Sequence, residues 1–131
     1  MDAAIARANL YLEAGADAIF PEALVNEDMF CEFARRVNAP LLANMTEFGK
    51  TPFFTAQQFQ DFGYRMVIWP VSSLRVSAFA SRRLFQTLQH HGSAASQVGE
   101  MLTRAELYDL IRYFEFEELD ASIARSVLPQ S

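Results

Sequence analysis

Cysteine is nearly absent from this sequence of 131 residues, since Cys31 is the only one. A single cysteine excludes an internal disulfide framework and is typical of a reducing compartment. The sequence has no run of about 20 apolar residues, which a membrane-spanning helix would need, and no signal-peptide pattern after Met1. We therefore expect a cytoplasmic protein without a membrane partner.

Positive charge is also scarce. Eleven Lys and Arg face 16 Asp and Glu, which gives a net charge of −5 and argues against a nucleic-acid partner. Because 51% of the residues are hydrophobic and 21% are charged, the chain should be globular rather than disordered. Its length indicates one domain, or part of a larger one, with a sizeable core.

The first 75 residues repeat a helix–strand unit. Apolar periodicity and the helix-ending residues Gly15, Pro40 and Gly63 predict helices at 3–13, 27–37 and 55–61, and strands at 18–20, 41–43 and 66–69. The strands are continuous apolar runs, which indicates that both of their faces are covered. The pattern predicts an α/β fold of parallel β/α units with right-handed crossovers.

Beyond residue 71 the pattern becomes helical. A long helix is expected at 75–91, then a linker of small residues (GSAASQVG), then a capping box at Thr103–Glu106 that opens another helix. A last short helix is expected before Pro129. We interpret residues 1–92 as β/α units and residues 93–131 as a linker with C-terminal helices.

Polar residues follow each expected strand. Glu22 follows the first strand, Asn44–Glu47 the second, and Ser72, Ser73 and Arg75 the third. Ligands of parallel β/α folds bind beyond the carboxyl ends of the strands, so these side chains should share one rim. Arginine pairs with carboxylates in a bidentate manner, which predicts a site for a small carboxylated ligand. A positive charge is unfavourable near the N-terminal end of a helix, where Arg75 is expected, so its position also indicates a nearby anion that offsets the charge.

Three strands are too few for a closed barrel. A (β/α)₈ barrel typically needs about 250 residues, and three parallel strands alone would leave two open edges. The residues leave two possibilities open: a small open α/β domain, or the back half of a barrel.

Four stretches carry a resemblance to a known family: "GADAIFPEA", "PLLANMTEFGKTPFFT", "VIWPVSSLR" and "MLTRAELYDLIRYFEFEELD". From about Ala3 to Leu119 the chain closely resembles the methylisocitrate lyases, which belong to the isocitrate lyase and phosphoenolpyruvate mutase superfamily. The resemblance implies a partial (β/α)₈ TIM barrel, about strands five to seven, plus C-terminal helices. It also implies a Mg²⁺-dependent lyase of propionate catabolism that cleaves 2-methylisocitrate to pyruvate and succinate.

The resemblance also implies roles for individual residues. The family's substrate contacts fall on Glu22, Asn44, Met45, Thr46, Arg75 and Arg104, and Glu22 could also accept a hydrogen bond from water on the metal. The family's Mg²⁺-binding aspartates and its catalytic acid, a cysteine, lie on earlier strands, so no catalytic residue and no direct metal ligand is predicted here. Cys31 is expected to be a structural, partly buried thiol.

Several functional readings follow from the resemblance. The first is the C-terminal part of a methylisocitrate lyase, inactive as an isolated chain but able to bind part of a dicarboxylate or tricarboxylate substrate. A related superfamily lyase, such as isocitrate lyase, is an alternative. Others are a non-catalytic dicarboxylate-binding or subunit-association module, and a half-barrel that reassembles with an N-terminal partner. The family implies a homotetramer in which subunits exchange C-terminal helices.

Overall fold

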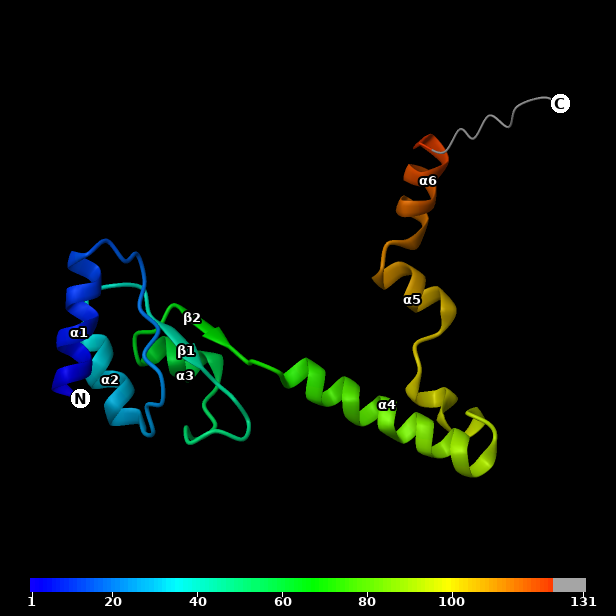
Figure 1. Cartoon of the computed structure of the whole chain (residues 1–131), viewed down its shortest axis with the longest axis horizontal. Coiled ribbons are helices and arrows are strands. Elements are labelled where there is room, and N and C mark those ends of the chain that lie inside the picture. Colours follow the sequence, from blue (N-terminus) through cyan, green and yellow to red (C-terminus); the bar gives the residue numbers. More distant parts are fainter. Residues whose placement is uncertain (124–131) are drawn as a thin grey trace. The chain divides into compact units, whose positions relative to one another are not determined.

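Two helices open the chain, and short strands then alternate with helices (Figure 1). A computed structural model describes residues 1–123, and the chain divides into two compact units after Ser81. The first unit contains α1 (Asp2–Glu13), α2 (Glu27–Arg36), β1 (Leu42–Asn44), α3 (Ala56–Asp61), β2 (Met66–Ile68) and the start of α4 (Ser72–His91). The division falls inside α4, whereas the sequence placed the boundary at residue 92.

The sheet is smaller than predicted. β1 and β2 pair in parallel, with Ala43 opposite Val67. The expected strand at 18–20 is reduced to a single parallel bridge between Ile19 and Leu41, so the prediction of three strands is wrong. Pro21 has no N–H group with which to extend a ladder, which explains why the pairing stops after one bridge. The predicted parallel order of the segments is confirmed.

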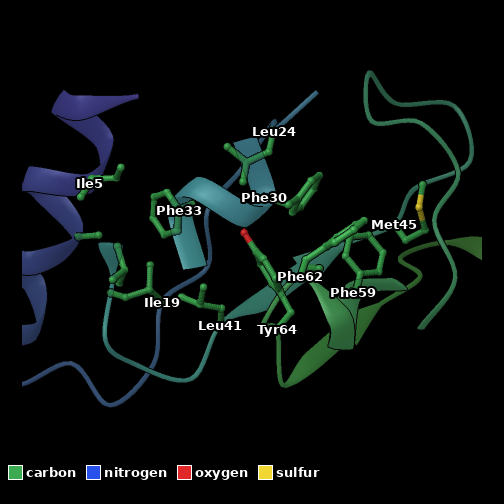
Figure 2. Close-up of a cluster of buried hydrophobic side chains, with 13 residues drawn as sticks. Ile5, Ile19, Leu24, Phe30, Phe33, Leu41, Met45, Phe59, Phe62 and Tyr64 are labelled. Carbon is green, nitrogen blue, oxygen red and sulfur yellow. The ribbon is translucent and has the colours of Figure 1, made fainter. Parts of the chain in front are cut away.

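The core of the first unit is aromatic. Phe30 of α2 is almost fully buried, and its ring centroid lies 5.2 Å from that of Phe59 and 5.3 Å from that of Tyr64, both edge to face. This is the arrangement that aromatic quadrupoles favour. Figure 2 shows these rings converging between α2 and α3, with Leu41 nearby. The core therefore fixes the helices on the sheet, whose strands lead to the predicted rim.

Capping residues start two of the helices in this unit. The Asn26 side chain accepts a hydrogen bond from the Met29 N–H at 2.9 Å, which begins α2. At α3, Thr55 and Gln58 form a reciprocal capping box. Both pairs satisfy backbone N–H groups that a helix terminus otherwise leaves without partners.

The second unit is helical. It contains the rest of α4, a 3₁₀ helix η1 (Ala95–Glu100) within the expected linker, α5 (Arg104–Leu110) and α6 (Tyr113–Ile123). The predicted capping box of Thr103 and Glu106 is present. No residue of this unit up to residue 123 is buried. The expected helix toward Pro129 is described only as far as Ile123, and the rest of that prediction lies outside the described residues.

None of the helices within residues 1–123 combines the length and the apolar character that crossing a membrane would require.

Candidate functional site

Glu22 and Asn44 meet at the carboxyl end of β1. Asn44 is the last residue of that strand, and its Nδ2 donates a long hydrogen bond of 3.4 Å to Glu22 Oε2. The other side-chain oxygen, Asn44 Oδ1, is buried and has no hydrogen-bond partner within the described residues. A buried acceptor without a partner costs roughly 1–3 kcal/mol. This oxygen is therefore suited to receive a donor from a ligand or from water.

A second group of rim residues joins the segment after β1 to the first turn of α4. Arg75 Nη1 donates to Glu47 Oε2 at 2.7 Å and more weakly to Thr46 Oγ1 at 3.4 Å. The Ser72 hydroxyl donates to the other oxygen of the same carboxylate, Glu47 Oε1. Arg75 Cζ also lies 5.0 Å from the ring centroid of Phe48, a cation–π contact.

Glu47 is a stable anion in this place. The hydroxyl of Ser72 first, then its own backbone and Arg75, hold the pKa of the Glu47 carboxyl below its usual value. The backbone N–H groups that begin α4 favour a negative charge as well. The anion that the sequence indicated beside Arg75 is thus supplied by the chain itself, and the offset alone does not require a bound ligand.

Two residues beside the rim have a left-handed backbone. Val71, between β2 and α4, has φ of 68°, and Ala23, directly after Glu22, has φ of 60°. A positive φ is uncommon outside glycine and is a clear outlier for a β-branched residue. Such strain often marks functional sites, where the surrounding structure enforces it. The left-handed Val71 lies directly before α4, whose residues Ser72 and Arg75 contact Glu47.

Two of the predicted residues stand apart from these contacts. The Met45 side chain is buried, and its Sδ accepts a hydrogen bond from the Phe54 N–H at 3.3 Å, so only its main chain could contact a ligand. Arg104 begins α5 in the second unit, where it lines a cleft of about 460 Å³ with Tyr108 and Phe114. That Arg104 completes the rim stays a prediction.

The sequence placed Glu47 and Ser72 at the rim, but the substrate contacts that the resemblance implies do not include them. Both lie in the strand-end segments that the sequence singled out, so their position was the available signal. Cys31 is exposed on α2, and the expectation that it is partly buried is wrong. Local desolvation, together with Glu27 and Asp28, raises the pKa of its thiol, which disfavours a reactive thiolate.

The described residues do not fit a magnesium site by themselves. Residues 1–123 contain no group of three or more His, Cys, Asp or Glu side chains that could hold a metal ion. At the rim, Glu22 offers a carboxylate, whereas Glu47 is committed to Ser72 and Arg75. Mg²⁺ takes about six oxygen ligands in octahedral geometry. The predicted Mg²⁺ stays a prediction for a protein that also contains the family's earlier strands.

Comparison with known proteins identifies the family. Residues 1–89 match the phosphoenolpyruvate phosphomutase family. The chain belongs to that family. The resemblance found in the four sequence stretches is confirmed by two 2-methylisocitrate lyases. That of Bacillus subtilis (strain 168) is 56% identical over 129 residues, 98% of this chain and 43% of the relative. That of Aeropyrum pernix is 52% identical over 122 residues, 93% of this chain and 40% of the relative.

A solved structure of the phosphoenolpyruvate mutase and isocitrate lyase superfamily has the same fold. A 2,3-dimethylmalate lyase superposes with a TM-score of 0.81 at 26% identity, over 95% of this chain and 43% of that one. The prediction of a mixed α/β fold of this superfamily is therefore confirmed, with a two-stranded sheet in place of the expected three strands. The chain spans less than half the length of each of these three relatives.

Proposed function

We propose that this chain is the C-terminal part of a carbon–carbon lyase that cleaves 2-methylisocitrate to pyruvate and succinate, and that it supplies part of the site for the substrate carboxylates. The observation that carries the proposal is the rim where Asn44 meets Glu22 and Thr46 meets Arg75. The 56% identity to a 2-methylisocitrate lyase supports this substrate. A related superfamily lyase, such as isocitrate lyase, is the alternative within the same class.

Each rim residue has a binding task in this proposal. The Arg75 guanidinium pairs with a substrate carboxylate, the Thr46 hydroxyl adds a hydrogen bond, and the unpaired Asn44 Oδ1 accepts one. Glu22 accepts a hydrogen bond from substrate or from water. Cleavage also needs a base for the hydroxyl proton and an acid for the succinate carbon. The family resemblance assigns that acid to strands that precede these residues.

A reconstitution experiment tests the proposal. The 131-residue chain alone should not cleave 2-methylisocitrate, because the acid and the metal ligands are expected outside it. Mixing it with the N-terminal remainder of the Bacillus subtilis relative should restore pyruvate release, since the chain matches 43% of that enzyme. Arg75→Gln should abolish the restored activity, whereas Arg35→Gln, on the exposed face of α2, should not. Activity of the chain alone, or none after mixing, would refute the proposal.

A non-catalytic dicarboxylate-binding module is the second candidate. One observation favours it: the rim contacts lie within a single compact unit, so they do not depend on another chain. Titration of the chain alone with succinate separates the candidates. Micromolar affinity would favour the module, and much weaker binding would favour a half-site that needs the rest of the barrel.

We also propose that the chain associates with further copies through α5 and α6, as the resemblance implies. Leu110, Phe114 and Leu119 are 69%, 61% and 54% exposed there. Adjacent exposed apolar side chains are typical of interaction surfaces.

A further inference from the structure

We propose that Glu47 is a positioning residue, which holds the Arg75 guanidinium ready to bind a substrate carboxylate. The inference deepens the proposed function and rests on it, because it concerns the same rim. The sequence pattern places Glu47 at the rim, but neither it nor the comparisons give this residue a role of its own.

The side-chain hydrogen bonds hold the Arg75 guanidinium through one nitrogen, Nη1, and an aromatic ring lies near its central carbon. Glu47 Oε2 and Thr46 Oγ1 both accept from the same nitrogen, Nη1 of Arg75, and Arg75 Cζ lies 5.0 Å from the centroid of the Phe48 ring. The Nε–Nη2 edge has no hydrogen-bond partner among the residues that the structure describes. This edge presents two parallel N–H groups, the arrangement that binds a carboxylate in a bidentate manner.

The holding carboxylate is itself fixed. Its second oxygen accepts from the Ser72 hydroxyl, so Glu47 spans two side chains of the first turn of α4. Arginine has many rotamers, and fixing one of them in advance removes an entropy cost from binding. Glu47 thereby links the segment after β1 to the first turn of α4, which carries Arg75.

Two other roles for Glu47 make different predictions. As a competitor, it would occupy the donors that the substrate needs, and its removal would tighten binding. However, Glu47 bonds to Nη1, which leaves the Nε–Nη2 edge to a ligand. As an ordinary surface ion pair, it would contribute little, because exposed pairs are weak. The Glu47 and Arg75 side chains are only 29% and 37% exposed, and Ser72 and Phe48 add contacts that an isolated pair lacks.

The test compares variants in the complex of the full 131-residue chain with the N-terminal remainder of the Bacillus subtilis relative. Glu47→Gln keeps the shape and removes the charge, Glu47→Asp keeps the charge, and Ser72→Ala frees one carboxylate oxygen. Glu32→Gln is the matched control, because Glu32 forms an ion pair of the same length, 2.7 Å, with Arg36 on α2. Circular dichroism confirms that each variant folds.

A positioning role predicts a specific kinetic pattern. Glu47→Gln should raise KM for 2-methylisocitrate about tenfold or more and change kcat less, because a misplaced binding group weakens substrate capture. Glu47→Asp should recover most of the loss, Ser72→Ala should fall between, and Glu32→Gln should match the wild type. A KM for Glu47→Gln within about twofold of the wild type, or below it, would overturn the proposal.

A second measurement keeps this inference separate from the proposed function. If the wild-type complex does not cleave 2-methylisocitrate, the lyase proposal fails, and positioning is then judged on the chain alone. Succinate should shift the Arg75 Nε–H resonance in nuclear magnetic resonance spectra, and Glu47→Gln should weaken that binding about tenfold while Glu32→Gln does not. Equal affinities in the variants, or no shift in the wild-type chain, would overturn the positioning role.

Discussion

Val71 and Asn44 are the rim residues whose local state costs free energy. Val71 is held at φ of 68°, and Asn44 Oδ1 is buried without a partner in the described part of the chain. Core packing does not offset either cost, because Val71 is 49% exposed and Asn44 lies at the end of its strand. Costs of this kind persist where the surrounding structure enforces them, often at sites that act on a ligand.

Replacing Val71 with glycine should reveal the strain. A residue with a Cβ costs roughly 1–2 kcal/mol in the left-handed conformation, and glycine avoids this cost. Glycine loses more conformational entropy on folding, which cancels roughly 0.5–1 kcal/mol of the gain. Val71→Gly should therefore raise the free energy of unfolding by several tenths of a kcal/mol or more, measured by urea denaturation. Val71→Ala, which keeps the Cβ, is the control and should not stabilise the protein. A large loss of stability in Val71→Gly would contradict the strain.

At the scale of elements, two helices begin with the same type of cap, but only one of the two caps contains a charged residue. α3 begins with Thr55 and Gln58, and α5 begins with Thr103 and Glu106, each pair forming a reciprocal capping box. The hydroxyl and the backbone N–H of Thr103 hold the pKa of Glu106 below its usual value of 4.5. Gln58 does not titrate, so only the cap of α5 depends on pH.

Acidification should therefore weaken α5 and spare α3. Because the folded-state pKa of Glu106 is lowered, its stabilising contribution is complete above the unfolded-state value of 4.5 and is lost as pH falls through the lowered folded value. Amide hydrogen exchange across the first turn of each helix measures this. In Thr103→Ala, the pKa of Glu106 should rise toward its usual value, and Thr55→Ala is the matched control. Equal responses of the two helices to acid would rule out the interpretation.

The elements also show the limits of sequence patterns. The periodicity predicted α1, α2 and α3 close to their observed bounds, because apolar spacing and caps act within a turn or two of helix. It overestimated the segment at 18–20, where Ile19 makes one bridge to Leu41. Apolar composition indicates burial but does not say whether a neighbouring strand is present to pair with.

At the scale of the whole molecule, the two units differ in how many side chains they bury. All the buried residues in the described part of the chain belong to the first unit, from Ile5 to Tyr64. Within the second unit, Tyr108 stacks on Tyr113 with ring centroids 4.3 Å apart, but each ring remains partly exposed. These aromatic residues thus have no buried core of their own among the described residues of this unit.

Self-association through α5 and α6 should follow from this exposure. The chain should sediment as an oligomer, and Leu110→Glu combined with Phe114→Glu should shift it to the monomer, because charge opposes burial of the apolar face. Ser122→Glu adds a charge to an exposed position of α6 and should leave the oligomer intact. A wild-type chain that is monomeric in analytical ultracentrifugation would exclude this surface as a self-interface.

The sequence by itself determined the helices of the first unit, the capping box of α5, the parallel order of the segments and the placing of polar residues at strand ends. These depend on neighbours a few residues apart, which a periodic pattern records. Only the tertiary structure decided that Glu47 reaches Arg75 across 28 positions and Ser72 across 25. Those contacts depend on the register of β1 on β2 and on the left-handed turn at Val71, and no local spacing encodes either.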